Sequence, residues 1–505
     1  MREPIDRPHR LVAPGLAILL AVVAILPAGL VGDGRPVRAA TDIRPRITGI
    51  APLSREVYGY LPYWHIDSGT VDRIRYELVS TIAIFGLGIK ADGSLDTTLA
   101  GYQDYVGDNV AAITNAAHDK GVRVVPTFQL FDSGSLPKMT AFLGSTAAQD
   151  LFISQALALM GQRQADGANL DFEPMGAAQT PAYLSFVAKF RTAMRARFPD
   201  DTLVNATSAG AGKDLIVGLV PLVDRQLIMT YNYRWSGSTV AGAVAPLDNA
   251  TRTVKQHIER ILQWVPPGRV IMGVPYYGYD WPVTANLPNA TVQSSKTLYG
   301  AVTSVTYAGA RDFLAAHPTV VEHYDAVEGS AFFTYWDSGK KTWREVYFDD
   351  QRSLADKYDY VLTTGLAGVG IWTLDNDQGY PDLWNLLRAK FYAPVHAVAV
   401  GGSVTNVTVR SGYVEAVVHF SARNVGTVPE RGVWRWTIRD RNGRIWLSGS
   451  RAAETIYPGK AIGHLARVRI ATAARLPAGT YLLRVRFERT GATWRSPDVG
   501  FRQPF

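Results

Sequence analysis

The chain of 505 residues contains no cysteine, which excludes disulfide bonds and metal sites built on thiolates. Its nine histidines are scattered, and none combines with carboxylates at the spacing of a metal site. No phosphate-binding glycine loop and no serine nucleophile elbow occurs. We therefore expect neither a metal nor a cofactor. Hydrophobic residues make up 47% of the chain and charged residues 19%, which is typical of a folded protein, and the length predicts two or three domains.

Only one apolar run is long enough to cross a membrane, and it lies near the N-terminus. Arginines precede the run from Leu11 to Val31, and the small-x-small sequence Val37-Arg38-Ala39 follows it. This arrangement predicts a signal peptide over residues 1–39. An uncleaved anchor is the alternative, but Pro14 and Pro27 interrupt the run and favour cleavage. Both alternatives place the rest of the chain outside the cytoplasm, secreted or associated with the cell envelope.

After an expected linker over residues 40–56, short apolar segments alternate with helical patterns. One such pattern is the stripe from Val254 to Val265, for which we expect Asp248 as the N-cap and Pro266 as the stop. The expected strands are 57–61, 79–85, 123–128, 168–173, 203–207, 226–231, 269–275 and 368–373. This alternation predicts an α/β fold, a closed (β/α)8 TIM barrel over residues 57–393. An open doubly wound sheet is the alternative.

Two further parts of the chain have sequence patterns that differ from this alternation. Residues 276–360 contain aromatic, alternating stretches between the seventh and eighth strands, which predicts a small α+β insertion. Residues 394–505 consist of short alternating runs separated by glycine-containing turns, which predicts an immunoglobulin-like β-sandwich as an accessory domain. This last part carries 17 basic against 6 acidic residues. We interpret the excess as a solvated surface, with affinity for an anionic polymer as the alternative.

The segment from Asp166 to Glu173 has the most informative pattern in the chain. In a strand, every second side chain points the same way, so Asn169, Asp171 and Glu173 share one face while Leu170 and Phe172 share the other. Two carboxyl groups this close cannot both ionise at no cost, so we expect one to keep its proton at neutral pH and to act as a general acid. Active sites of (β/α)8 barrels lie at the C-terminal ends of the strands, where Glu173 falls.

This segment resembles the Asp-Gly-x-Asp-x-Asp-x-Glu signature of family 18 glycoside hydrolases, the chitinase-like barrels. Four further segments resemble the family's other strands in the expected order. They are Gly59–Trp64 for the first strand, Met229–Tyr231 for the sixth, Gly273–Gly278 for the seventh and Gly370–Trp372 for the eighth. The resemblance covers roughly residues 57–391.

The resemblance implies a mechanism and assigns roles. Glu173 would protonate the glycosidic oxygen, and the substrate's own 2-acetamido carbonyl would be the nucleophile. Asp171 would orient the acetamide N–H, and Tyr231 would donate its hydroxyl to the acetamide. Trp372 would form the floor under the sugar that reacts. The substrate must then carry an N-acetyl group, as chitin and peptidoglycan do.

Two positions depart from the family pattern. Asn169 stands where the family has a deeper aspartate, and Asn232 stands where it has an aspartate after the catalytic tyrosine. An asparagine can support Asp171 by a hydrogen bond but cannot titrate. These changes resemble the bacterial spore-cortex and cell-wall branch of the family, which favours peptidoglycan as the substrate. A chitinase and a non-catalytic, lectin-like glycan-binding protein are the alternatives, and the retained catalytic residues argue for an enzyme.

Aromatic side chains near the expected barrel rim complete the set of candidate substrate-binding residues. We expect Tyr60, Trp235, Tyr276 and Tyr277 to contact the glycan, because aromatic faces stack on sugar rings, and Asp280 to contact its polar groups. The expected partner is thus a polysaccharide. We expect no nucleic acid, no membrane beyond the N-terminal anchor alternative, and a monomer.

Overall fold

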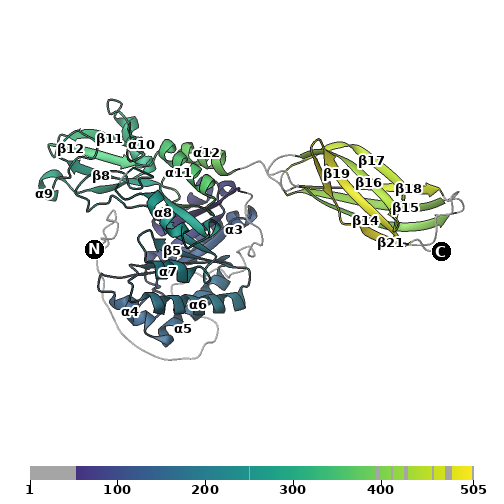
Figure 1. The fold of residues 1–505 in the computed structure, drawn as a ribbon, viewed down its shortest axis with the longest axis horizontal. Coiled ribbons are helices and arrows are strands. Elements are labelled where there is room, and N and C mark those ends of the chain that lie inside the picture. Colours follow the sequence, from purple (N-terminus) through teal and green to yellow (C-terminus); the bar gives the residue numbers. More distant parts are fainter. Residues whose placement is uncertain are drawn as a thin grey trace. The chain divides into compact units, whose positions relative to one another are not determined.

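The computed structural model describes residues 53–249, 251–392, 398–410, 413–425, 430–457, 460–471 and 480–502. The chain divides into two compact units between Phe391 and Tyr392 (Figure 1). The predicted signal peptide over residues 1–39, and all but the last four residues of the predicted linker, lie outside the described residues. Among the helices of the described part, none is both long and apolar enough to cross a membrane.

The first unit is built on a closed barrel of eight parallel strands. Their order around the barrel is β1-β13-β7-β6-β5-β4-β3-β2, and β1 pairs with β2 to close the ring. This confirms the predicted (β/α)8 fold and excludes the open sheet. The strands are β1 (Glu56–Pro62), β2 (Thr81–Gly88), β3 (Arg123–Phe131), β4 (Gly167–Glu173), β5 (Thr202–Ser208), β6 (Arg225–Met229), β7 (Val270–Pro275) and β13 (Gly368–Trp372).

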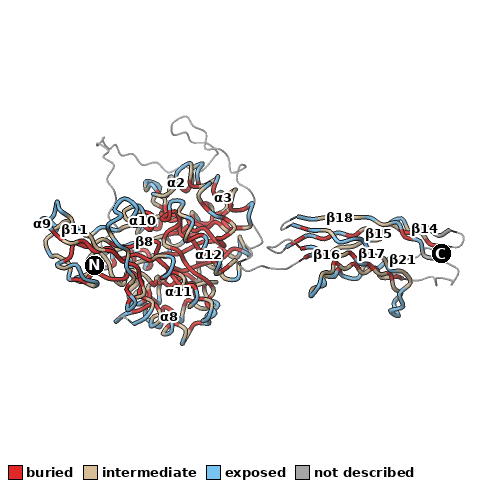
Figure 2. The backbone as a smooth tube through the Cα atoms, turned by 90° about the horizontal axis from the view of Figure 1, so that it is seen from above, coloured by how far each residue is buried: buried red, intermediate tan, exposed pale blue. Residues whose placement is uncertain are grey.

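Helices follow the strands and cover the outside of the barrel (Figure 1). They are α1 (Thr70–Arg73), α2 (Ala100–Val106), α3 (Asp108–Asp119), α4 (Pro137–Leu143), α5 (Thr146–Gln162), α6 (Thr180–Arg197), α7 (Lys213–Leu219), α8 (Val254–Leu262), α11 (Gln351–Thr364) and α12 (Pro381–Phe391). Buried residues fill the interior of this unit (Figure 2). Inside the ring, Tyr58, Val204 and Ile271 belong to one packed cluster, so the barrel is a filled core and not a pore.

The predicted N-cap of α8 is wrong. The helix begins at Val254 and its N-cap is Thr253, whose hydroxyl accepts a hydrogen bond from the backbone N–H of Gln256 at 3.2 Å. Asp248 instead accepts a hydrogen bond from the Lys255 ammonium at 2.7 Å. Thr253 directly precedes the apolar stripe, and a cap must lie within one turn of the N–H groups that it satisfies.

The insertion between β7 and β13 is a five-stranded antiparallel sheet with two helices. The strand order is β10-β11-β12-β8-β9. Its elements are β8 (Tyr277–Val283), α9 (Lys296–Tyr299), β9 (Thr303–Thr306), α10 (Tyr307–Ala316), β10 (His323–Asp325), β11 (Ser330–Asp337) and β12 (Thr342–Phe348). The insertion is shorter than the expected 276–360, because residues from Gln351 on form barrel helix α11, which Asp350 caps.

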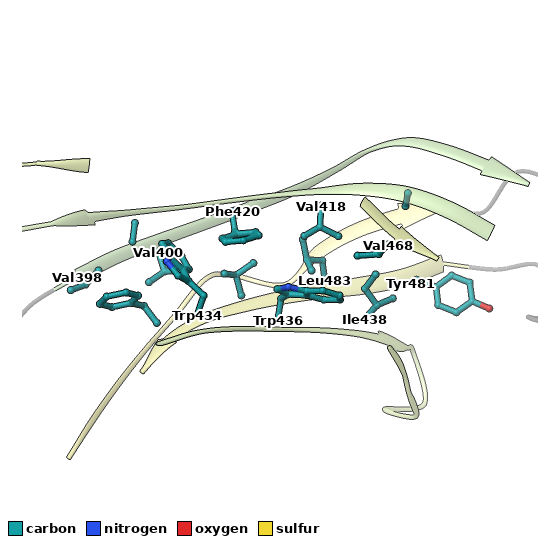
Figure 3. Packing of buried hydrophobic residues seen from close by; sticks show 14 of the residues in the cluster. Val398, Val400, Val418, Phe420, Trp434, Trp436, Ile438, Val468, Tyr481 and Leu483 are labelled. Atoms are coloured by element: carbon teal, nitrogen blue, oxygen red, sulfur yellow. The ribbon is translucent and has the colours of Figure 1, made fainter. Parts of the chain in front are cut away.

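The second unit consists of two antiparallel sheets that share one hydrophobic core. One sheet has the order β14-β15-β18, and the other has β17-β16-β19-β20 with β21 on β19. Trp434 and Trp436 from one sheet and Phe420 from the other lie in this core (Figure 3). A sandwich is thus present, whereas its immunoglobulin-like topology stays a prediction. The strands are β14 (Val398–Arg410), β15 (Tyr413–Asn424), β16 (Glu430–Asp440), β17 (Ile445–Ile456), β18 (Ala461–Ala471), β19 (Thr480–Arg489), β20 (Ala492–Arg495) and β21 (Val499–Arg502).

A chain shortened to end at Tyr392 is expected to fold and to stay soluble without the second unit. The first unit closes on itself, because the backbone N–H of Ser54 donates to the carbonyl of Phe391 at the end of α12. Solubility and the thermal midpoint of unfolding measure the outcome. A matched chain that ends at Asp382 loses the buried Leu387 and Phe391 and should be insoluble. An insoluble product of the first chain would contradict the division at this point.

Candidate active site

Strand β4 carries the polar face that the sequence pattern predicts. Asn169 and Asp171 are buried, and Glu173 at the end of the strand is half-buried. Leu170 and Phe172 are buried on the opposite side, where the Phe172 ring contacts aromatic rings of α4 and α6. The outward side chains thus pack under the helices, and the inward ones line the barrel axis. Parallel neighbours on both sides hold the strand in this orientation.

Asn169 lies deepest on this face and is fully buried. Its side-chain Nδ2 donates to the hydroxyl of Tyr60 at 3.2 Å and to the hydroxyl of Thr127 at 3.3 Å. Its Oδ1 atom has no hydrogen-bond partner among the described residues. Burial, and then the charge of Asp171, raise the pKa of Tyr60 well above its ordinary value. Tyr60 therefore stays protonated, and the inner part of the site holds neutral groups around one buried carboxylate.

Tyr231 follows β6 and leans over the neighbouring strand β7. A Cβ atom at Gly273 would lie only 2.9 Å from the Tyr231 ring, so this close approach requires glycine. The hydroxyl of Thr230 ties the same turn to β7 by donating to the carbonyl of Gly273 at 2.6 Å. Burial raises the pKa of Tyr231, and the nearby tyrosines and the two carboxylates of β4 raise it further. Its hydroxyl is therefore a donor at neutral pH and lies near both carboxylates.

Trp372, the last residue of β13, joins the aromatic side chains of the site. Its ring stacks on Tyr231, with centroids 6.4 Å apart and an angle of 26° between the planes. It meets Tyr60 edge to face, with centroids 5.3 Å apart. The structure thus brings together Tyr60 and Trp372 from two strands and Tyr231 from the turn after β6.

Asn232 organises the edge of the site toward the insertion. Its φ angle is +64°, a left-handed conformation that asparagine tolerates better than most residues. Its Oδ1 atom accepts hydrogen bonds from the hydroxyls of Tyr277 and Tyr279, each at 3.0 Å. A neutral amide thus holds two tyrosines of β8 next to Tyr231. Trp235, four residues after Tyr231, is half-buried and packs against the same cluster of side chains.

Two predicted substrate-binding residues lie away from this site. Tyr276 is buried, and its hydroxyl shares a hydrogen bond of 2.9 Å with Tyr358 of α11, so it belongs to the helical layer. Asp280 lies on the opposite face of β8 from Tyr279, because successive side chains alternate. There it accepts hydrogen bonds from Arg344 and from Tyr335, each at 2.8 Å. Asp280 therefore stabilises the insertion, where its polar atoms are already engaged.

Sequence analysis missed two aromatic residues next to the carboxylates. Phe85 of β2 meets the Trp372 ring at a centroid distance of 4.8 Å, and Phe131 lies 6.1 Å from Phe85. Phe131 is 41% exposed and is the register partner of Glu173. Trp64, 49% exposed, extends this group at 5.9 Å from Phe85. The sequence pattern predicts that the third strand ends at residue 128, so it does not show that Phe131 shares the inward face of β3 with Thr127, which contacts Asn169.

No group of three or more histidine, cysteine, aspartate or glutamate side chains in the described part of the chain could hold a metal ion. The chemistry that the site can perform with its own residues is acid and base catalysis by carboxylates, with hydroxyl donors and aromatic surfaces around them. Such a set suits a sugar that presents polar edges and apolar faces.

Comparison with known proteins identifies the family. The model of glycosyl hydrolases family 18 matches residues 57–377, which spans the barrel and the insertion. The chain belongs to glycosyl hydrolase family 18. The catalytic unit is therefore a glycosidase, and the resemblance seen in the strand motifs is confirmed.

The similar proteins include enzymes with two kinds of substrate in their names. A sporulation-specific glycosylase, YdhD, of Bacillus subtilis is 26% identical over 64% of this chain and 74% of its own. Di-N-acetylchitobiase of Mus musculus is 27% identical over 59% of this chain and 83% of its own. In the solved structure of the spore cortex-lytic enzyme SleL of Bacillus cereus, the fold matches with a TM-score of 0.54 and 22% identity, over 66% of this chain and 73% of that one.

Asn169→Asp is expected to move the acidic limb of the pH profile of kcat/KM to higher pH, by about one unit. A carboxyl group two residues from Asp171 would add a like charge, which raises the pKa of neighbouring acids. Initial rates on a soluble substrate between pH 3 and 8 measure the shift. Asn169→Ala is the matched control, because it removes the two hydrogen bonds without adding a charge. Equal profiles for the aspartate variant and the unchanged protein would show that position 169 is not coupled to catalysis.

Proposed function

We propose that this protein is an exported glycosidase that hydrolyses β-linked glycans of N-acetylated amino sugars by substrate-assisted catalysis with retention of configuration. The observation that carries the proposal is the inward face of β4. Glu173 lies at the C-terminal end of this strand, and Asp171 lies two residues earlier on the same face, about 7 Å back along the strand. Tyr231 follows barrel strand β6, and the charges of both carboxylates contribute to the rise of its pKa.

Glu173 is the general acid of the proposed reaction. Its proton passes to the glycosidic oxygen as the bond from that oxygen to the anomeric carbon breaks. The carbonyl oxygen of the substrate's acetamide forms a new bond to the same carbon and gives an oxazolinium ion. Water then attacks the anomeric carbon, the bond from the acetamide oxygen to that carbon breaks and restores the acetamide, and Glu173 takes the water's proton. Two successive inversions leave the configuration unchanged. The half-buried position of Glu173 suits this role, because the leaving group must reach it from the cleft.

Asp171 and Tyr231 stabilise the acetamide as its charge changes. Positive charge develops on the acetamide nitrogen in the transition state, and Asp171, buried on the inward face of β4, would pair with that charge. An oriented charge acts strongly in a site from which water is excluded. Tyr231, whose raised pKa keeps its hydroxyl protonated, donates a hydrogen bond to the acetamide oxygen and holds that oxygen toward the anomeric carbon. In this scheme Trp372 supports the reacting sugar from below.

The aromatic group formed by Phe85, Phe131 and Trp64 supports a cleft for more than one sugar. Two of its rings are about half-exposed, although exposed aromatic rings are costly in water unless a ligand covers them. Phe131 extends the surface directly beside Glu173. A glycan chain that lies across this surface would present successive rings to it. We therefore assign these residues to substrate binding.

Peptidoglycan is the proposed substrate, and the extracytoplasmic side is the proposed location. The asparagines at 169 and 232, and the similarity to a sporulation-specific glycosylase, support a cell-wall glycan. The arginines, the apolar run and the small-x-small site at the N-terminus support export. The second candidate is activity on chitin-type oligosaccharides, which the similarity to di-N-acetylchitobiase favours.

Glu173→Gln is expected to lower kcat by a factor of about 10² to 10⁴, the usual contribution of a general acid. Glycan binding should be largely kept, because glutamine has the same shape and still forms hydrogen bonds. Reducing-sugar release and a pull-down on insoluble glycan measure the two properties. Glu77→Gln, at an exposed ion pair with Arg388, is the control and should leave both unchanged. Full activity of the Glu173 variant would refute the assignment of the acid.

Purified peptidoglycan and chitin oligosaccharides, assayed side by side, decide between the two substrates. We expect reducing ends to be released from peptidoglycan, with initial rates above those on chitin oligosaccharides at equal concentrations of N-acetyl groups. The Glu173→Gln variant serves as the blank on both substrates. Activity confined to chitin oligosaccharides would overturn the cell-wall proposal while leaving the mechanism intact.

A further inference from the structure

The loop between β6 and α8 carries Tyr231, Asn232 and Trp235, and the insertion holds this loop by backbone pairing. The N–H of Ala241 donates to the carbonyl of Ala290 at 3.0 Å, and the N–H of Val292 donates to the carbonyl of Thr239 at 2.9 Å. The segment that follows β8 thus runs beside the loop between β6 and α8, which we call the catalytic loop. Tyr231 and Trp235 pack on the hydrophobic cluster that both segments help to form.

Three carboxyl groups of the insertion lie behind these paired segments, and we call Asp325, Glu328 and Glu345 the carboxyl knot. All three are buried, with at most 8% of each residue exposed. Glu345 accepts hydrogen bonds from the consecutive backbone N–H groups of Asn289 and Ala290, at 2.9 and 3.1 Å. It therefore fixes the segment that pairs with the catalytic loop.

The other two members extend the carboxyl knot to the loop itself. Glu328 accepts a hydrogen bond from the backbone N–H of Ala243 at 2.5 Å, and its second oxygen faces the guanidinium of Arg234 at 3.7 Å. Asp325 accepts hydrogen bonds from the side chain of Asn289 at 2.8 Å and from the hydroxyl of Tyr347 at 2.9 Å. Arg234 and Ala243 both belong to the catalytic loop, so Glu328 holds that loop at two points.

The charges of the carboxyl knot do not balance when every member is ionised. The titratable groups that act on Glu345 are Asp325 from β10, Glu328 from the turn after it and Tyr347 from β12, and Arg234 of the catalytic loop faces Glu328. Within the described residues, Arg234 is the single cation that forms an ion pair with the knot. Three carboxylates would therefore face one guanidinium in a buried space, which is unfavourable.

Burial raises the pKa of Glu345 to about 7, and the charges of Asp325 and Glu328 add to the shift although two backbone hydrogen bonds oppose it. Burial also raises the pKa of Glu328. Glu345 is thus the member that keeps its proton most readily.

We infer that Glu345 and Glu328 are positioning residues for catalysis, and we call this pair the brace. The brace restrains residues 231–245 of the catalytic loop more strongly while Glu345 is protonated than once Glu345 is ionised. This inference rests on the proposed function for its effect on hydrolysis. Its structural part, the pH-dependent hold on residues 231–245, does not depend on that function, because it rests on the contacts of Glu345 and Glu328 and on the burial of three carboxyl groups together.

The direction of the pH effect follows from the sign of the shift. An acid whose pKa is higher in the folded than in the unfolded protein favours the folded arrangement at low pH. That advantage is complete below the ordinary value of 4.5, and it is lost progressively up to about 7. The hold on the catalytic loop should therefore weaken between these two values, and the orientation of Tyr231 should deteriorate with it.

Hydrogen exchange on the full-length chain tests the brace without using hydrolysis. Protection of the backbone amides of residues 231–245, corrected for intrinsic exchange, is measured at pH 5, 6, 7 and 8. We expect protection to fall at least about tenfold over this range, the factor that one pKa unit represents. In Glu345→Gln, whose side chain cannot ionise, we expect the protection of these amides to be independent of pH. In the unchanged protein kcat/KM on a soluble glycan should fall together with the protection, and in this variant that fall should be absent.

Two further variants complete the test. Glu322→Gln is the matched control, because this carboxyl lies in the same subdomain and pairs with Arg311 outside the carboxyl knot. It should behave as the unchanged protein. Glu328→Gln removes a charge that faces Arg234, so it should lower protection of the loop at every pH, and it serves if Glu345→Gln does not fold. A loop whose protection has the same pH dependence with and without Glu345 would overturn the inference.

The two proposals fail separately. If the loop responds to pH as expected but no N-acetylated glycan is hydrolysed, the proposed function is wrong and the brace stands. If glycans are hydrolysed and Glu173→Gln is inactive, but the pH dependence of amide protection in the loop is the same with and without Glu345, the brace is wrong and the proposed function stands.

Discussion

Closure of the barrel is the constraint on which the rest of this structure depends. Because β1 hydrogen-bonds to both β2 and β13, the strands form a ring in which every inward side chain approaches side chains from several other strands. Asn169 of β4 can then reach Tyr60 of β1, although 109 residues separate them in the chain. The same closure buries Asp171 and leaves Glu173 at the open end. An open sheet with the same strands would not bring these groups together.

The insertion adds a second constraint on the site. Its strand β8 follows β7 directly, so Tyr277 and Tyr279 reach the turn after β6 and share Asn232 as their acceptor. The opposite face of β8 carries Asp280, which is engaged with Arg344. One face of β8 thus contributes to the site, and its other face makes contacts within the insertion. Alternation of side chains in a strand, and not the composition of the segment, decides which residue has which task.

Much of the fold could be read from the chain because its signals are local. The eight apolar segments were expected close to their observed bounds, since buried parallel strands are short and rich in β-branched residues. The predicted bounds differ from the observed ones where neighbouring segments carry the same kind of sequence signal. Thr253 caps α8 although Asp248 is also a good capping residue, and β3 continues to Phe131 beyond its apolar core. Helix α11 begins inside the range predicted for the insertion, because no glycine or proline separates it from strand β12.

The sequence by itself determined the family, the barrel and the residues on the inward face of β4, because strand periodicity and a chain of ordered motifs depend only on neighbouring positions. Only the tertiary structure decided which aromatic residues surround that face. Tyr276 lies under α11 while Phe85 and Phe131 lie beside Trp372 and Glu173, and these neighbours come from strands far apart in the chain. It also decided that Glu345, Glu328 and Asp325 are buried together. Such contacts depend on how segments pack, and packing is a property of the whole chain and not of any stretch of it.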